Sequence, residues 1–162
     1  MKKIFFTFVL ILFKFNVAYS LVEVDITRGN LDPLPIAVSP LHVDNQSENY
    51  KDIKVKELGD LVSSVIEKNF KSTGLFNPIN KDAFVQKPDI AHLKPRFEDW
   101  RLITAQALVT GKLLVKDGKL KVEFRLWDIA ASQEMVALAF TTTPSNWRRV
   151  AHIISDKIYE RL

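Results

Sequence analysis

The sequence predicts an α/β domain of the α+β type, in which two principal helices pack on a β-sheet. Apolar residues follow a helical period over residues 53–70 and again over residues 145–162. Between these segments, apolar and charged residues alternate after Asp117-Gly118, the strongest short hairpin signal in the chain. A third observation is the apolar stretch 36–38, which indicates a buried strand ahead of the first helix.

The length and composition of the chain are typical of one compact domain. The chain has 162 residues, of which 47% are hydrophobic and 26% are charged. Its formal net charge is +4, but Lys2, Lys3 and Lys14 account for three of these charges, and the first twenty residues contain no Asp or Glu. The remainder is therefore close to neutral, which does not support an electrostatic nucleic-acid surface.

Residues 1–20 have the three parts of a secretory signal peptide. Lys2 and Lys3 precede an apolar run, and the small residues Ala18 and Ser20 fit a cleavage site after Ser20. The alternative is an uncleaved membrane anchor. A spanning helix needs about twenty apolar residues, and Lys14 shortens this run, so cleavage is preferred.

Residues 21–33 form the predicted N-terminal strand or arm. Apolar positions alternate with polar ones, namely Val22, Val24 and Ile26 with Glu23, Asp25 and Thr27. Arg28-Gly29-Asn30 and two prolines follow, and no hairpin partner is adjacent. The segment is therefore either a flexible arm or a member of the domain's own sheet.

We expect the domain to cover residues 34–162. Its first half begins with a strand within residues 34–43, and Pro40 limits the length of this strand. A polar loop is expected over residues 44–51, and a helix over residues 53–70 with a stop at Gly74. A short strand over residues 75–79 and a mostly irregular segment over residues 80–96 follow.

The second half begins with a short helix packed through Phe97 and Trp100, which extends over Thr104 to Leu108. Three strands are expected next, over residues 107–115, 119–126 and 135–142, with one face of the hairpin buried. The last helix presents one apolar face: Trp147, Val150, Ala151, Ile154, Ile158 and Leu162. No polar tail follows Leu162, which indicates a domain whose continuation is missing.

Motifs for catalysis or metal binding do not occur in the sequence. Cysteine is absent, and His42, His92 and His152 lack metal-ligand spacing. The serines Ser63-Ser64 and Ser145 are not in a G-x-S-x-G context, and no glycine-rich phosphate loop is present. We therefore expect no catalytic residue, no metal and no cofactor. His152 is expected to flank the core face of the last helix.

Two tryptophans stand beside cations, at Trp100-Arg101 and Trp147-Arg148-Arg149. Such pairs can stack on bases or bind a polyanion. The alternative, which we prefer, is that each tryptophan anchors a helix in the core while its arginine reaches solvent.

Six strings in order resemble the TolB N-terminal domain family. They are LPIAV (34–38), STGLFNPI (72–79), WR (100–101), LVTG (108–111), VEFRLWD (122–128) and WRRVAH (147–152), the last followed by SDKIYE (155–160). They extend over almost all of the chain after the signal. The resemblance implies a mixed β-sheet with two principal helices packed on it, which agrees with the pattern of elements.

The resemblance also implies a function. It implies a non-enzymatic, periplasmic interaction module of the Tol-Pal cell-envelope system, which supports outer-membrane integrity and envelope constriction during cell division. The β-propeller that follows this domain in the family, and that provides most of the surface for the Pal lipoprotein, is expected to be absent. A TolA-like inner-membrane protein is the implied partner, with neither a nucleic acid nor a small-molecule substrate.

The implied partner-binding residues lie in the arm: Val22, Glu23, Val24, Asp25, Ile26, Thr27 and Arg28. We expect the arm to add a strand to an exposed sheet edge of the partner, with the apolar side chains in alternate pockets. The alternatives are a small secreted enzyme whose site is scattered along the chain, and an envelope protein that binds polyanions through the Trp-Arg positions.

Overall fold

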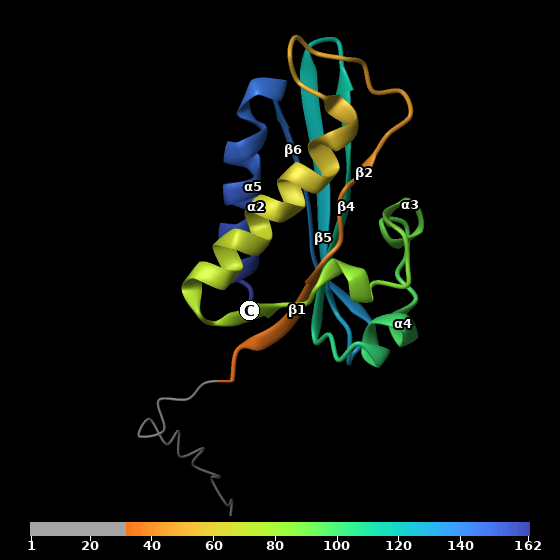
Figure 1. Ribbon diagram of the computed structural model, residues 1–162, viewed down its shortest axis with the longest axis vertical. Helices are drawn as coiled ribbons and strands as arrows, with labels where there is room; N and C mark the ends of the chain where they lie inside the picture. Colours follow the sequence, from red (N-terminus) through yellow and green to blue (C-terminus); the bar gives the residue numbers. More distant parts are fainter. Residues whose placement is uncertain (1–31) are drawn as a thin grey trace, which may run out of the picture. The chain divides into compact units, whose positions relative to one another are not determined.

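A computed structural model describes residues 32–162 (Figure 1). The predicted signal peptide and the predicted partner-binding residues Val22 to Arg28 lie outside this part of the chain. None of the helices in residues 32–162 is long and apolar enough to cross a membrane.

A six-stranded mixed sheet forms the centre of the domain, in the order β3-β1-β4-β5-β6, with β2 also paired to β4. The strands are β1 (Leu34–Val38), β2 (His42–Val43), β3 (Phe76–Pro78), β4 (Ala107–Lys116), β5 (Lys119–Asp128) and β6 (Gln133–Thr142). β1 is parallel to both β3 and β4, and β2 is parallel to β4. β4, β5 and β6 form the antiparallel part. The predicted mixed sheet is confirmed.

Two principal helices, α2 (Leu58–Thr73) and α5 (Trp147–Tyr159), lie on the same side of the sheet (Figure 1). α2 ends at Gly74, which has the left-handed conformation (φ +71°) that glycine adopts without strain, as predicted. Its start was predicted too early. Ile53 forms an isolated bridge with Tyr50, and the 3-10 helix η1 (Val55–Glu57) precedes the α-helix.

The opposite side of the sheet carries the small helices α3 (Pro88–Ala91) and α4 (Phe97–Leu102) (Figure 1). Residues 80–96 were predicted to be mostly irregular, but they contain α3 and the 3-10 helix η2 (Lys81–Ala83). Local contacts explain both: Pro88 occupies the first turn of α3, and the Asn80 side chain accepts a hydrogen bond from the backbone N–H of Asp82 (3.0 Å).

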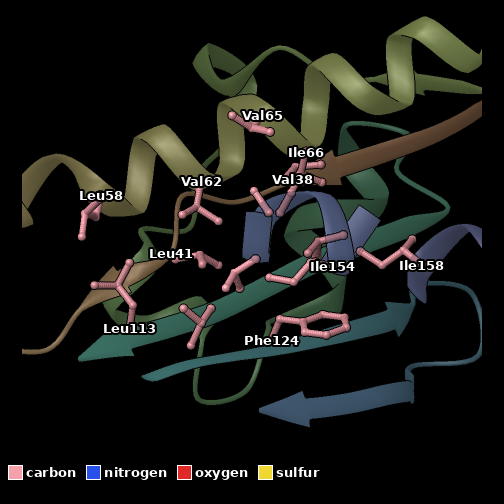
Figure 2. Packing of buried hydrophobic residues seen from close by; sticks show 14 of the residues in the cluster. Val38, Leu41, Leu58, Val62, Val65, Ile66, Leu113, Phe124, Ile154 and Ile158 are labelled. Carbon is pink, nitrogen blue, oxygen red and sulfur yellow. The ribbon is translucent and has the colours of Figure 1, made fainter. Parts of the chain in front are cut away.

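The main core lies between the sheet and the two principal helices (Figure 2). The alternating residues of β5 on this side are buried, which confirms the predicted hairpin face: Leu120, Val122, Phe124 and Leu126. Asp117 and Gly118 both have positive φ (50° and 67°), as a type I′ turn requires. A smaller core on the other side of the sheet surrounds Trp100 and Trp127.

Three assignments near the element ends were wrong. Thr104 has φ of +59° and lies in the turn after α4, and Leu108 belongs to β4 and not to the preceding helix. Leu162 lies beyond the end of α5 and is 46% exposed, so it is not part of the core. The left-handed turn at Thr104 ends the helix, and backbone pairing with Ala37 and Trp127 assigns Leu108 to β4.

Candidate functional site

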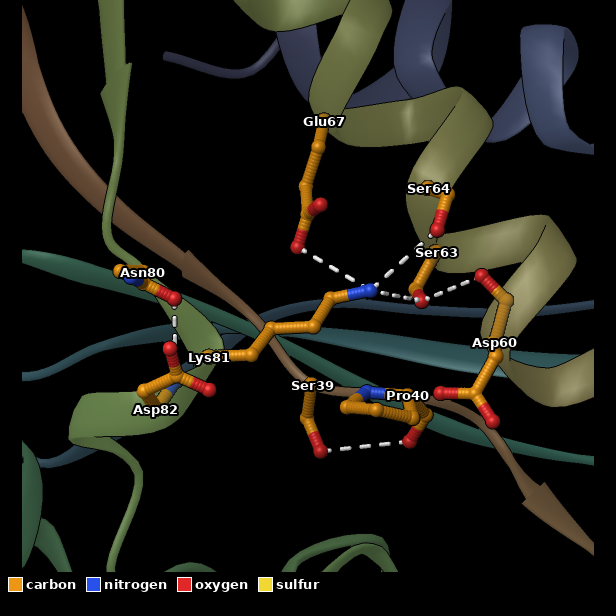
Figure 3. A network of polar contacts seen from close by, with 9 residues as sticks. All are labelled: Ser39, Pro40, Asp60, Ser63, Ser64, Glu67, Asn80, Lys81 and Asp82. Atoms are coloured by element: carbon orange, nitrogen blue, oxygen red, sulfur yellow. Dashed lines mark hydrogen bonds and ion pairs between the residues drawn. The ribbon is translucent and has the colours of Figure 1, made fainter.

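The arm residues predicted to bind a partner, Val22 to Arg28, lie outside the described residues. Within residues 32–162, the most extensive polar cluster joins α2 to the segment after β3. Its centre is Lys81, the first residue of η2, whose side chain extends toward α2 (Figure 3).

Lys81 makes three contacts with one face of α2. Its Nζ donates a hydrogen bond to Ser63 Oγ (2.9 Å) and a longer one to Ser64 Oγ (3.4 Å), and it forms an ion pair with Glu67 Oε1 (3.4 Å). Glu67 lies four residues after Ser63 and three after Ser64, spacings that place it on the same face of the helix as the two serines. The Ser63 hydroxyl in turn donates to the backbone carbonyl of Asp60 (2.9 Å).

The electrostatics of the cluster depend on its partial burial. Burial raises the pKa of the Glu67 carboxyl, the Lys81 charge opposes this rise, and Asp60 adds to it. The ion pair lacks hydrogen-bond geometry, so the buried Oε1 atom of Glu67 has no hydrogen-bond partner among the described residues. Glu67 therefore depends on Lys81 for compensation of its charge.

A serine beside a lysine can form a nucleophile and a base, but this cluster has a different arrangement. A general base must be neutral and must accept the hydroxyl proton. Here the Lys81 ammonium donates to both serines and is paired with Glu67, while the Ser63 proton is directed to the Asp60 carbonyl. The contacts fasten the segment after β3 to α2 and leave no base beside the serine.

A shallow cleft of about 570 Å³ lies beside this cluster. Lys68 and Lys71 on α2 contribute to one wall, and Pro78 and Ile79 contribute to the other. The cleft is open to solvent, and both lysines are exposed.

The structure brings together two of the three histidines that are far apart in the sequence. The rings of His42 on β2 and His92 after α3 stack in parallel, with centroids 4.4 Å apart and an interplanar angle of 3°. Burial lowers the pKa of His42, and the His92 ring lowers it further. No group of three or more His, Asp or Glu side chains in residues 32–162 has the arrangement of a metal site.

His152 was predicted to flank the core face of α5. It is exposed, and its Nδ1 lies 3.0 Å from Asn69 Nδ2 on α2. The same amide group donates to Ser155 Oγ (2.9 Å). His152 therefore contributes to the contact between the two principal helices at the surface.

The tryptophans anchor the fold to different degrees. Trp100 is 1% exposed, and its Nε1 donates to Gln86 Oε1 (3.0 Å), which confirms its predicted role. Trp147 is only partly buried, and the Arg148 guanidinium stacks on its ring at 4.7 Å from the centroid. Arg101 is paired with Glu98.

Together these elements define a class of protein: a small α/β domain whose mixed sheet carries two principal helices on one side and two short helices on the other. Comparison with known proteins gives the family. The family model of the TolB amino-terminal domain matches residues 22–135 of the sequence, so the chain belongs to the TolB amino-terminal domain family. The matched range includes residues 22–33 of the predicted arm and five of the six sequence strings, and it confirms the resemblance.

A curated relative agrees with this assignment. The Tol-Pal system protein TolB of Pelagibacter ubique (strain HTCC1062) is 62% identical over 164 residues, a match that covers 100% of this chain and 36% of the relative. The chain therefore spans little more than a third of the length of the curated relative.

Solved structures share the fold. The crystal structure of TolB from Acinetobacter baumannii matches with a TM-score of 0.62 and 19% identity, over 80% of this chain and 28% of that one. Protein XCC0632 from Xanthomonas campestris matches with a TM-score of 0.50 and 5% identity, over 80% and 83% of the two chains. At these identities the likeness concerns the fold alone.

Proposed function

We propose that this chain is a non-catalytic interaction module of the Tol-Pal envelope system and that it works in the periplasm. The observation that carries the proposal is the 62% identity to a Tol-Pal system protein TolB over the whole length of the chain. A secretory signal pattern over residues 1–20 supports the location. The module would support outer-membrane integrity and envelope constriction.

The partner in this proposal is a TolA-like inner-membrane protein, bound through the arm. Residues Val22 to Thr27 alternate apolar and polar side chains, and the family match begins at residue 22. An extended segment with this alternation can add a strand to an exposed sheet edge, since its backbone supplies the hydrogen bonds and alternate side chains fill pockets. Asp25 and Arg28 would adjust specificity at the rim, where charges contribute little affinity.

The alternative of a polyanion-binding protein is less well supported. It requires free cations beside Trp100 and Trp147. Arg101 is paired with Glu98, and Arg148 is stacked on Trp147, so two of the three cations in these motifs already have partners within the domain. Only Arg149 has neither an ion pair nor a stacked ring among the described residues, and a single cation is little to hold a polyanion.

Deletion of residues 21–32 tests the role of the arm. The partner is the C-terminal domain of the TolA-like protein from the same genome, and its affinity is measured by calorimetry, with thermal melting as the check of folding. A shortened protein that melts like the parent and no longer binds supports the proposal. One that melts like the parent and binds equally well refutes it, and one that does not fold shows that the segment belongs to the core.

Two point variants refine this test. Val24→Ser removes one of the alternating apolar side chains, and Glu23→Ser changes the neighbour that would point the other way in an added strand. If strand addition fills alternate pockets, Val24→Ser weakens binding much more than Glu23→Ser. Equal effects of the two variants would be inconsistent with this mode of binding.

A further inference from the structure

The two edges of the sheet differ in their protection. β3 is three residues long, ends at Pro78 and packs beside α2. β6 has ten residues, Gln133 to Thr142, without a proline or glycine, and Glu134 is its only charged residue. Natural proteins protect sheet edges with short strands, prolines, charges or covering elements. The β3 edge follows this rule, and the β6 edge does not.

The outer backbone of β6 is free within the described domain. β6 pairs only with β5, and no backbone hydrogen bond joins residues 133–142 to any other segment of residues 32–162. A free edge of this length presents N–H and C=O groups that can pair with another extended chain.

A groove of about 230 Å³ lies at one end of this edge, between residues 140–142 of β6 and α5. Phe140, Val150 and Ile153 supply its apolar part. Asn146 and Arg149, near the start of α5, supply its polar part. Arg149 is exposed and has no ion pair among the described residues. The guanidinium that stacks on Trp147 belongs to its neighbour Arg148.

We propose that the β6 edge, together with the groove between β6 and α5, binds an extended segment of a partner protein as an added strand. The segment has apolar side chains at alternate positions, which enter the groove beside Phe140 and Ile153, and a carboxylate that pairs with Arg149. Its backbone completes the hydrogen bonds of β6. This surface uses residues other than the arm, so it does not rest on the proposed function.

Charge distinguishes this occupant from a second copy of the chain. If β6 paired with β6 of another copy, the only carboxylate on either strand would be Glu134. Glu134 is already paired with Arg125 (3.0 Å) and lies opposite Trp127, on the side of the sheet away from α5. Arg149 would then face no carboxylate of the paired strand, whereas an acidic side chain of a partner segment would satisfy it.

The probe for this proposal is a phage-displayed library of ten-residue peptides, selected against the purified protein. The expected sequences alternate apolar residues and contain at least one Asp or Glu. The best peptide is then synthesised, and its affinity is measured for the parent and two charge-reversal variants. Arg149→Glu should weaken binding about tenfold, because like charges at an interface repel, whereas Arg148→Glu should leave it within about twofold because Arg148 contacts Trp147.

N-methylation of the peptide tests strand addition itself. In an added strand, alternate N–H groups face the edge, and the others face solvent. Methylation of the N–H groups that face the edge should therefore abolish binding, and methylation of those that face solvent should leave the affinity unchanged. The proposal is overturned by selection of no binder, by peptides without alternation, by equal tolerance of both methylated sets, or by binding unaffected by Arg149→Glu. A dimer that a Leu138→Lys variant converts to monomer would show that a second copy occupies the edge instead.

Discussion

Gly111 on β4 lies directly opposite Phe124 on β5, and the side chain of Leu41 packs closely against it. A Cβ atom at Gly111 would overlap the carbonyl oxygen of Glu123 and approach Leu41 Cδ2 to 2.9 Å. Leu41 is held from the other side by α2, since its backbone N–H donates to the Gly59 carbonyl (3.2 Å). Two glycines thus allow one leucine to join the sheet to the first principal helix.

Gly59→Ala should destabilise the protein although it lies in a helix. Alanine is favoured over glycine by about 1 kcal/mol in a helix interior. The added Cβ would overlap the backbone carbonyl of Leu41, however, and such overpacking costs about 1–3 kcal/mol. Urea denaturation measures the net change. A gain in stability of the size given by helix propensity would show that the contact is not tight.

Phe124→Ala should lower the free energy of unfolding by about 3–5 kcal/mol, the range for loss of a buried phenylalanine. Phe124 is 1% exposed, and its ring stacks on Phe140 with centroids 6.1 Å apart. Lys119→Ala, an exposed position on the same strand, is the control and should change little. A loss below about 1 kcal/mol for Phe124→Ala would be inconsistent with the hairpin register.

Lys81→Met should destabilise the protein more at pH 7.5 than at pH 4. Burial already raises the pKa of Glu67, and removal of the Lys81 charge should raise it further. When the pKa of a carboxyl is higher in the folded than in the unfolded chain, the contribution of that carboxyl to stability is greatest below its pKa in the unfolded chain. This contribution falls as the pH rises toward its pKa in the folded chain. We expect a loss of about 1–2 kcal/mol at pH 7.5, less than for a fully buried pair.

The double variant Lys81→Met with Glu67→Gln provides the matched control. The neutral glutamine removes the uncompensated charge, so part of the loss at pH 7.5 should be recovered. Chemical denaturation at the two pH values measures both effects. Equal losses at pH 4 and pH 7.5 for the single variant would mean that Glu67 is not ionised in the folded protein or is well solvated.

Acidification from pH 7.5 to 5.5 should lower the melting temperature through the stacked histidine pair. Burial lowers the pKa of His42 below 6.5, and the nearby His92 and Lys112 lower it further. The carboxylates of Asp44 and Asp89 raise this pKa and so oppose part of the shift. The unfolded chain therefore takes up a proton first as pH falls through 6.5, and stability decreases. A His42→Asn variant should lose part of this dependence, whereas His152→Asn, which leaves the pair intact, should keep it. Equal pH profiles of the two variants would contradict the assignment.

Protein recovered from the envelope should begin at Leu21. Ala18 and Ser20 supply the small residues of the cleavage site, and Lys2 and Lys3 supply the basic start of the signal. Intact-mass measurement decides this prediction, and a mass that includes Met1 would refute it.

The sequence by itself determined the elements whose signal is local. The helical period before Gly74 predicted α2. The apolar run before Asp117-Gly118 predicted β4, and the alternation after it predicted β5 with its buried face. The order of strings also indicated the family. These predictions succeeded because helix periodicity, a left-handed glycine and a type I′ turn depend on residues close together in the chain.

Tertiary structure alone decided the contacts between distant segments. Lys81 meets Ser63 eighteen residues away, and His42 stacks on His92 across fifty residues of sequence. The parallel pairing of β1 with β3 and β4, and the free edge of β6, likewise follow from how strands order themselves in the sheet. Such neighbours have no local pattern in the sequence, because burial of the shared core brings them together only when the whole domain has folded.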